Sequence, residues 1–306
     1  MVALALTGCS AATTPIAADA DSRTVDTVFG EVIVPADVDS VVVIEGRRDL
    51  DIVLSLGLPL VGYPYEGEET GRDLEAPLES LTEEAAANGA VDLFLDDEIN
   101  VEAIAEAAPA LIIGRYSDVE PILDELNAIA PTIAIGDQST STWQEDLTLI
   151  GQATGTEDKA AELIAAYDAR AREIATTYAD VIAANTVVPF SYDEEGSAVR
   201  AGRLMSVALL DVGAQPSEAF TAAIGNEDGA DFSLEQTYAA YADADAAIAL
   251  INTADSWAMA EADPLVQQLP AFLADHVVRS DRATHEGAAV TAMACLDVIE
   301  QLYASL

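Results

Sequence analysis

Residues 100–115, NVEAIAEAAPALIIGR, contain the pattern that decides the fold. Apolar residues at helical spacing lead up to Pro109 and predict a short helix that ends before it. The apolar run 111–113 then has the length of a buried strand, and Arg115 follows it after one glycine. The stretch therefore predicts a helix, a strand, and a guanidinium placed at the carboxyl end of that strand.

The same succession of helix and short apolar strand recurs in both halves of the chain. It appears in VEPILDELNAIAPTIAI at 119–135 and, more loosely, in SLEQTYAAYADADAAIALIN at 233–252. Helices that alternate with short strands at this spacing are typical of a parallel sheet with right-handed crossovers. The length suggests about two domains. We therefore expect an α/β protein of two lobes, each with a central parallel β-sheet flanked by helices.

One long helix is expected between these α/β segments. Thr156 is followed by two acidic residues, which favours a helix start, and apolar residues then recur at helical spacing. A helix over 156–182 would be about 40 Å long at about 1.5 Å per residue, enough to run from one lobe to the other. We predict an N-terminal lobe at 28–155, a connecting helix at 156–182 and a C-terminal lobe at 183–306.

The chain is strongly acidic yet has the composition of a folded protein. It has 55 Asp and Glu residues against 12 Lys and Arg residues, a formal net charge of -43, and 51% hydrophobic residues. Such an excess of negative charge repels nucleic acid and bare anionic membrane surfaces, so nucleic acid is not expected as a partner. A solvated acidic surface explains the charge, and it makes each of the few arginines more informative.

The N-terminal sequence MVALALTGCS resembles the cleavage site of a bacterial lipoprotein signal. Small residues precede Cys9 after a short apolar run, so residues 1–9 are interpreted as a truncated signal and Cys9 as the lipid-carrying residue. Residues 10–27 are small and polar, as in a flexible tether. The second cysteine, Cys295, lies in an apolar-periodic helix and is expected to be a buried thiol.

Motifs of catalysis are missing from the sequence. There is no glycine-rich phosphate loop with lysine and no G-x-S-x-G elbow, and HEGAA at 285–289 lacks the second histidine of a zinc protease. The chain has only two histidines, which argues against a histidine-rich metal site. We therefore expect a protein that is not an enzyme and that has no resident metal or cofactor.

Arginines and aromatic residues follow strand ends or glycine turns in both halves of the chain. Ligands of open parallel sheets bind outside the carboxyl ends of the strands, so these side chains should meet in a cleft between the lobes. Guanidinium groups bind carboxylate or catecholate oxygens, and rings cover apolar faces of a ligand. The alternatives are an ion pair with a neighbouring carboxylate for each arginine and simple packing for each ring. The candidate ligand-binding residues are Arg47, Arg48, Tyr63, Tyr65, Arg115, Tyr116, Trp143, Tyr192, Arg200, Arg203, Trp257 and His285.

Taken in order, several stretches resemble the solute-binding proteins of iron–siderophore and cobalamin ABC importers, of the lipoprotein type. The resemblance covers nearly all of residues 30–306. It rests on DLDIVLSLGLPLVGY, NVEAIAEAAPALIIG, ILDELNAIAPTIAI, WQEDLTLIGQATGTEDKAAELIAAYDARAREI, FSLEQTYAAYADADAAIAL and ADPLVQQLPAFLADHVV. It implies two lobes bridged by a single long backbone helix.

The resemblance also implies a function and partners. An acidic residue on each lobe of such proteins docks into the permease dimer, and the matching positions here are Glu102 and Glu235. The chain would then be a monomer, lipid-anchored outside the cytoplasm through Cys9, that carries a ferric siderophore to an ABC permease with its ATPase. The chelator would supply the ligands of the iron.

Other ligands and roles remain open at this point. Cobalamin is a known ligand class of the family, and haem could use His285 or a tyrosine. The cleft arginines favour an anionic ferric siderophore over both. A membrane-anchored sensor or interaction protein on the same fold is the alternative from another functional class.

Overall fold

The computed structural model describes residues 22–67, 72–96, 98–137, 140–226 and 228–306. The predicted lipidation site, Cys9, and the predicted signal at 1–9 lie outside the described residues. Among the helices of the described ranges, none has both the length and the apolar character needed to cross a bilayer.

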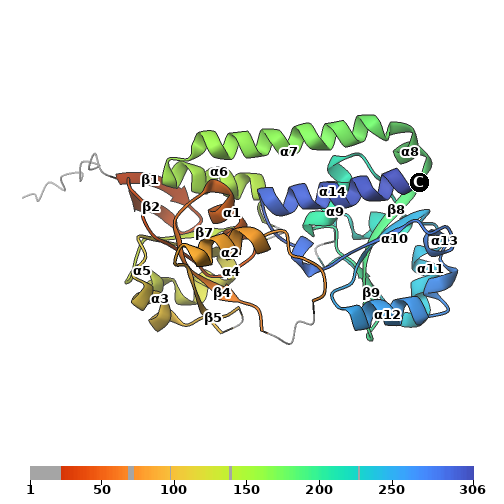
Figure 1. Cartoon of the computed structure of the whole chain (residues 1–306), viewed down its shortest axis with the longest axis horizontal. Coiled ribbons are helices and arrows are strands. Elements are labelled where there is room, and N and C mark those ends of the chain that lie inside the picture. Colours follow the sequence, from red (N-terminus) through yellow and green to blue (C-terminus); the bar gives the residue numbers. More distant parts are fainter. Residues whose placement is uncertain (1–21, 68–71, 97, 138–139, 227) are drawn as a thin grey trace, which may run out of the picture.

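The N-terminal lobe contains, in its described part, a five-stranded sheet in which all neighbouring strands are parallel. The strands lie in the order β5, β4, β3, β6, β7, with helices beside the sheet (Figure 1). The strands are β3 Val41–Val43, β4 Leu60–Tyr65, β5 Val91–Leu95, β6 Leu111–Arg115 and β7 Thr132–Ile135. The helices are α1 Arg48–Leu56, α2 Glu79–Ala87, α3 Val101–Ala107, α4 Tyr116–Val119, η2 Glu120–Ile122, α5 Leu123–Asn127 and α6 Trp143–Thr154.

Helices cover both faces of the N-terminal sheet, so consecutive residues of strands β3 and β6 are buried and apolar. Val41 and Ile113 belong to one core cluster with residues of α1 and α6. Val42 and Ile112 point to the opposite face and pack in a second cluster with Ile104 of α3. Alternate side chains of a strand face opposite sides, so a strand buried on both sides is a continuous apolar run. The helix and strand predicted from residues 100–115 are therefore confirmed.

The C-terminal lobe is built on a mixed sheet. In the described residues its order is β11, β9, β8, β12, β13, with β10 beside β8. Strands β8, β10, β12 and β13 are parallel, whereas β9 and β11 are antiparallel additions at one edge. The strands are β8 Thr186–Tyr192, β9 Ser197–Val199, β10 Gln215–Pro216, β11 Ala230–Phe232, β12 Ala246–Leu250 and β13 Val277–Ser280. The helices are α9 Leu204–Asp211, α10 Glu218–Ala223, η3 Leu234–Gln236, α11 Thr237–Tyr241, α12 Ala254–Ala262, η4 Val266–Gln268, α13 Pro270–Leu273, η5 Arg282–Thr284 and α14 Ala289–Ser305.

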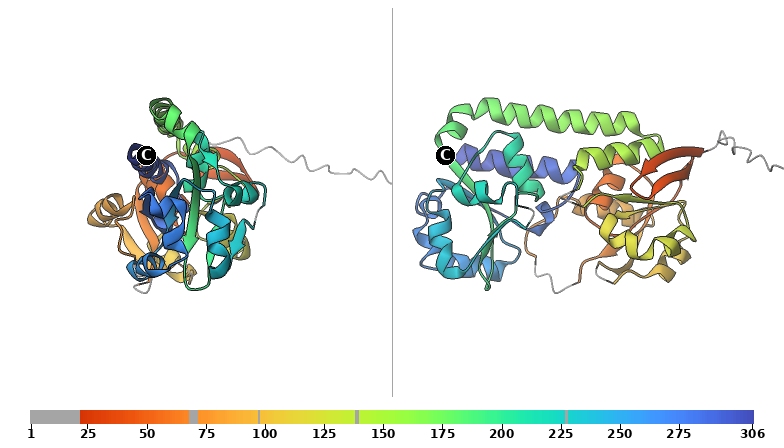
Figure 2. Two further views of the ribbon diagram at one scale, coloured as in Figure 1. Left: turned by 90° about the vertical axis from the view of Figure 1, so that its right-hand side faces the viewer. Right: turned by 180° about the vertical axis from the view of Figure 1, so that it is seen from behind.

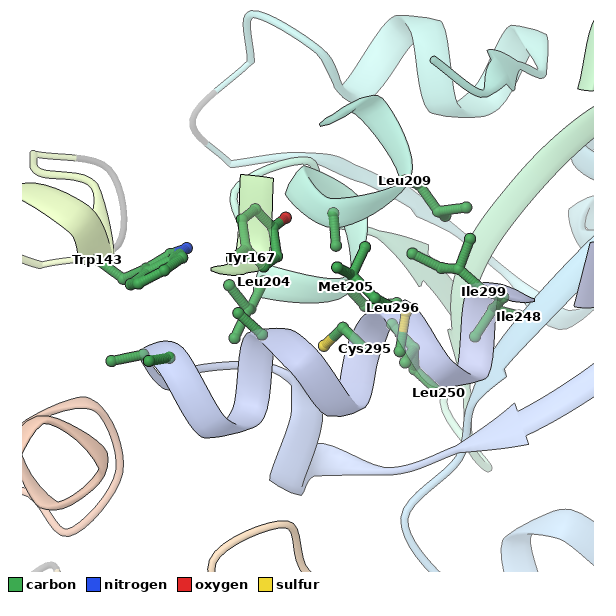
Figure 3. Packing of buried hydrophobic residues seen from close by; sticks show 14 of the residues in the cluster. Trp143, Tyr167, Leu204, Met205, Leu209, Ile248, Leu250, Cys295, Leu296 and Ile299 are labelled. Atoms are coloured by element: carbon green, nitrogen blue, oxygen red, sulfur yellow. The ribbon is translucent and has the colours of Figure 1, made fainter. Parts of the chain in front are cut away.

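A single long helix, α7 Glu157–Thr177, spans both lobes along one side of the molecule (Figures 1 and 2). A separate short helix, α8 Ala179–Ala184, follows it, so the helix predicted over 156–182 is broken at Tyr178. Beneath α7 lies one continuous cluster of buried apolar side chains that includes residues of both lobes. Figure 3 shows part of it, from Trp143 to Ile299, with Cys295 as a buried thiol. A shared core of this kind holds the two lobes together over much of their length.

The first described residues form a hairpin rather than a tether. Strand β1 Ser22–Thr27 pairs antiparallel with β2 Gly30–Pro35. Val25 is buried, and Arg23 Nη1 donates a hydrogen bond to the carbonyl of Ala36 at 2.5 Å. The tether predicted over residues 10–27 is therefore wrong for 22–27, because pairing with β2 and burial of Val25 stabilise an extended strand there.

Candidate ligand-binding cleft

Two adjoining cavities lie between the lobes, and a third continues from them in the C-terminal lobe; together they form the cleft. The arginine cavity, about 490 Å³, is lined by Arg47 and Arg115 from one lobe and by Arg200, Arg203 and His285 from the other. The apolar cavity, about 440 Å³, lies beside it, and Arg47 and Glu286 line both. A third cavity of about 560 Å³ extends the cleft into the C-terminal lobe, since it shares Arg200 and Arg203 with the arginine cavity.

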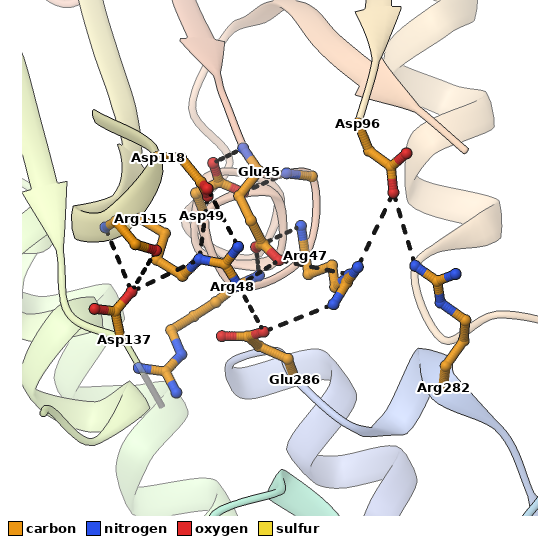
Figure 4. Close-up of polar contacts among 12 residues, drawn as sticks. Glu45, Arg47, Arg48, Asp49, Asp96, Arg115, Asp118, Asp137, Arg282 and Glu286 are labelled. Carbon is orange, nitrogen blue, oxygen red and sulfur yellow. Dashed lines mark hydrogen bonds and ion pairs between the residues drawn. The ribbon is translucent and has the colours of Figure 1, made fainter. Parts of the chain in front are cut away.

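Arg115 reaches the cleft from the carboxyl end of β6. Its Nε lies 3.1 Å from Asp118 Oδ2, and its Nη1 lies 3.5 Å from Glu45 Oε1 and 3.4 Å from Glu286 Oε2. Glu286 precedes α14 and belongs to the opposite lobe, so Arg115 bridges the cleft (Figure 4). The preceding Gly114 is required here, because a Cβ at that position would lie 2.7 Å from Ile44 Cβ.

Arg47 lies next to Arg115 and shares its carboxylates. Arg47 Nε is 3.5 Å from Glu45 Oε1, and Arg47 Nη1 is 3.9 Å from Glu286 Oε2. The side chain is one-third exposed. The two guanidinium groups and the buried carboxyl groups of Glu45 and Glu286 thus form one cluster of ionisable groups that reaches across the cleft (Figure 4).

Glu45 was not among the candidates predicted from the sequence. Burial, together with the charges of Asp49 and Glu286, raises the pKa of the Glu45 carboxyl to about 8, although the charges of Arg47 and Arg115 lower it. Asp49 lies beneath it and accepts backbone N–H groups from Ile44, Glu45 and Gly46 at 2.7–2.9 Å. This fully buried carboxylate shapes the turn between β3 and α1 that carries Arg47.

Arg203 differs from the other cleft arginines because its charge has no close counter-ion. Among the described residues no carboxylate lies within 4.0 Å of it, and its buried Nη1 has no hydrogen-bond partner there. Burial lowers the pKa of Arg203 to about 10, and the neighbouring charge of Arg200 lowers it as well. Arg200 itself is paired with Asp231 at 2.5 Å. Arg203 therefore presents an uncompensated positive charge to the arginine cavity.

His285 lines the same cavity and is neutral near pH 7. Burial lowers its pKa to about 3, and the charges of Arg203, Arg47 and Arg282 lower it too. A neutral imidazole adds polar contact to the cavity without adding charge.

Two of the predicted tyrosines line the apolar cavity. Tyr63 and Tyr65 are at the end of β4, where Tyr63 is buried and Tyr65 is 42% exposed. Burial and a hydrogen bond with Asp92 raise the pKa of Tyr63 to about 12, so its phenol stays protonated. Arg72 and Arg282 line this cavity as well. Arg282 could have been found by the rule that identified Arg115, since it follows the end of β13.

The structure does not bring Arg48 and Trp143 to the cleft. Arg48 turns away from its neighbour Arg47, and its Nη1 forms a buried ion pair with Asp146 Oδ2 at 2.8 Å. Trp143 is 2% exposed and packs edge-on against Tyr167 in the core beneath α7. Consecutive residues at a helix start point in different directions, so only one of the two adjacent arginines can face the ligand.

Three further aromatic candidates also lie outside the three cavities. Tyr192 is buried, and its hydroxyl donates a hydrogen bond to Asp263 Oδ2 at 2.6 Å. Tyr116 stacks on Phe29 at 5.2 Å between ring centroids. Trp257 packs under the guanidinium of Arg279 at 5.8 Å. These rings contact residues of their own lobes and do not line the three cavities.

Glu102 and Glu235 are exposed and lie in the first turns of α3 and η3, one in each lobe. Helices α3 and α11, which directly follows η3, lie on the part of each lobe that is remote from α7 (Figures 1 and 2). Both carboxylates are therefore accessible to a partner.

Two α/β lobes, one connecting helix and an arginine-lined cleft between them define the class of two-lobed solute-binding proteins. The chain belongs to the periplasmic binding protein family, whose family model matches residues 75–284.

Comparison with curated proteins gives relatives over part of the chain. It is 41% identical over 92 residues to the probable siderophore-binding lipoprotein YfiY of Bacillus subtilis (strain 168), which covers 30% of this chain and 28% of that protein. It is 35% identical over 83 residues to the iron-uptake system-binding protein of the same organism, covering 27% and 26%. Each match thus spans little more than a quarter of the relative.

Comparison with solved structures covers nearly the whole chain. Staphylococcus aureus SirA complexed with staphyloferrin B has a TM-score of 0.74 at 17% identity, covering 92% of this chain and 97% of that one. The siderophore periplasmic binding protein from the fuscachelin gene cluster of Thermobifida fusca has a TM-score of 0.70 at 27% identity, with coverages of 89% and 98%. These similarities confirm the two-lobed α/β fold.

Proposed function

We propose that the protein captures a ferric siderophore in the cleft and delivers it to an ABC permease. The observation that carries this proposal is the half-buried Arg203, whose buried Nη1 has no hydrogen-bond partner among the described residues, in a protein with a net charge of -43. A buried charge without a partner is costly, and an anionic ligand in the arginine cavity would remove that cost.

The distribution of the cations supports the same ligand. Among the described residues, six of the chain's 12 cationic side chains line the three cavities: Arg47, Arg72, Arg115, Arg200, Arg203 and Arg282. Ferric catecholates and carboxylates are bulky anions whose oxygens accept hydrogen bonds from guanidinium groups. The iron would stay coordinated by its chelator. SirA with staphyloferrin B and FeuA with ferri-bacillibactin share the fold.

The remaining parts of the proposal concern delivery. The protein would act outside the cytoplasm as a monomer without catalytic activity, anchored by lipid on Cys9, and one relative is named a siderophore-binding lipoprotein. Glu102 and Glu235 would dock the two lobes onto the permease dimer, which their exposure on both lobes permits.

Calorimetric titration of the non-lipidated protein tests the ligand. The probes are a ferric tris-catecholate, a ferric trihydroxamate, ferric dicitrate, haemin and cobalamin. We expect saturable binding of an anionic ferric chelate, weakened in Arg203→Met and unchanged in Arg172→Met, a control on the exposed surface of α7. Binding of cobalamin or haemin alone, or of none of the five probes, would overturn the proposal.

A further inference from the structure

We propose that the ligand carries an uncharged hydrophobic arm beside its anionic iron centre, and that the apolar cavity binds this arm. This inference rests on the proposed function, because it assigns the iron centre to the arginine cavity. It narrows the ligand from ferric siderophores in general to those with an apolar substituent.

The walls of the apolar cavity are built largely from carbon. Its apolar lining residues include Leu50, Tyr63, Pro64, Pro77, Leu78 and Ala86. The volume of about 440 Å³ is within the usual range of sites for small molecules. Transfer of an apolar group from water into a cavity with apolar walls is favourable.

Helix α2 has no fully buried residue. A helix on a globular protein normally buries an apolar stripe, yet none of the nine residues of α2 is buried. Four of them, spaced on one face, line the cavity: Glu79, Thr82, Glu83 and Ala86. The two carboxylates are exposed to solvent. Ala85 of α2 packs, partly buried, against the main core cluster. The face with Thr82 and Ala86 instead borders the cavity, whose space is available to a ligand.

The arginines of the apolar cavity are paired with carboxylates, unlike Arg203 of the arginine cavity. In the apolar cavity, Arg72 is paired with Glu66 at 3.3 Å and with Asp281 at 3.1 Å. Arg282 is paired with Glu66 at 3.4 Å and with Asp96 at 3.7 Å. These cations are already neutralised, so they do not require an anionic group as Arg203 does.

One ligand can occupy both cavities because they are contiguous. Arg47 and Glu286 line the two cavities from their common border. An anionic centre held by Arg115 and Arg203 would therefore direct a substituent past Arg47 towards Tyr63 and α2.

The test compares three ferric complexes by calorimetric titration. The parent is a synthetic ferric tris-catecholate, the second carries one hexyl chain on the chelator backbone, and the third carries an aminohexyl chain in the same place. We expect the hexyl complex to bind at least about tenfold more tightly than the parent. We expect the aminohexyl complex to gain less, because its ammonium group would have to be desolvated.

Two variants of α2 test whether the hexyl chain binds in the apolar cavity. Ala86→Trp would fill the cavity from an exposed position and should bring the hexyl complex to the affinity of the parent. Ala87→Trp lies on the same helix but outside the cavity lining, and it should still bind the hexyl complex more tightly than the parent complex. Ala87→Trp should also bind the parent complex with unchanged affinity.

The outcomes separate the two proposals. The hydrophobic-arm site would be overturned if the parent and hexyl complexes bound with equal affinity. It would also be overturned if the hexyl complex still bound more tightly than the parent complex to Ala86→Trp. Either result would leave the proposed function standing. An aminohexyl complex that binds more tightly than the hexyl complex would overturn the uncharged character of the arm. Absence of binding by all three would overturn the inference together with a catecholate ligand for this cleft.

Discussion

Asp51 of the N-terminal lobe caps helix α14 of the C-terminal lobe, where its Oδ2 accepts the backbone N–H of Thr291 at 2.9 Å. The same carboxylate accepts the N–H of Ala288 at 2.7 Å and that of Val290 at 3.1 Å. Ala288, at the N-cap position of α14, offers no side-chain acceptor of its own. The lobes are thus joined by a fully buried polar contact as well as by α7 and the shared core.

Asp51→Asn should destabilise the fold. One amide oxygen replaces two carboxylate oxygens, and the new amide N–H groups face backbone donors in a buried site. We expect the free energy of unfolding to fall by about 2–4 kcal/mol, measured by urea denaturation. Asp26→Asn, on the exposed side of β1, is the control and should change it by less than about 0.5 kcal/mol. An unchanged Asp51→Asn variant would show that α14 needs no cap from the other lobe.

Glu45 should make stability depend on pH. Its folded-state pKa of about 8 lies above its ordinary value of 4.5, so the folded state holds a proton that the unfolded state releases between these values. The Glu45 contribution is therefore fully present below about pH 4.5 and is lost as pH rises to about 8.

Denaturation at several pH values from 5 to 8 measures this contribution. The free energy of unfolding of the parent protein should fall by on the order of a few kcal/mol over that range, and Glu45→Gln should abolish this fall. The exposed Glu125→Gln variant should keep the pH profile of the parent protein. Identical pH profiles for Glu45→Gln and the parent protein would mean that Glu45 is ionised throughout.

Arg203→Met should separate binding from stability. Methionine retains much of the side-chain volume but removes a half-buried charge that has no close counter-ion among the described residues. We expect the affinity for the ferric ligand to fall by at least about 30-fold, or about 2 kcal/mol. The free energy of unfolding without ligand should stay equal or rise by about 1 kcal/mol. Lower stability together with lower affinity would instead indicate a structural role for this guanidinium.

Arg47 and Arg48 should behave differently although they are adjacent. Arg48→Met leaves the buried Asp146 carboxylate unpaired and should cost about 3–5 kcal/mol of stability, with ligand affinity unchanged in the folded fraction. Arg47→Met should weaken ligand binding and have a small effect on stability, because Arg47 is one-third exposed. Urea denaturation and calorimetric titration of both variants distinguish the two roles. The reverse pattern would place Arg48 in the ligand site.

Glu102→Lys combined with Glu235→Lys should abolish uptake of the ferric ligand by cells. Both side chains are exposed and outside the three cavities, so the purified double variant should bind the ligand with unchanged affinity. Glu106→Lys, exposed on the same helix as Glu102, is the matched control for charge reversal. Normal uptake by the double variant would favour a sensor or interaction role over transport.

The sequence was a good guide to the fold because its signals are local. The helix and strand of 100–115, the long helix after Thr156 and the buried strands follow from the spacing of apolar residues alone. The strand-end rule also selected Arg47, Arg115, Arg200 and Arg203, which line one cavity. That rule works because parallel strands present their carboxyl ends at a common edge.

The sequence alone determined the two α/β lobes, the connecting helix and the acidic character of the chain, because periodicity and composition are properties of contiguous residues. Only the tertiary structure decided which side chains share the cleft. It directed Arg47 to the cleft and Arg48 into the core, buried Trp143 and Tyr192, and placed Glu286 beside Arg115, which is 171 positions away in the sequence. Such pairings depend on how the lobes pack against each other, and no local pattern encodes that arrangement.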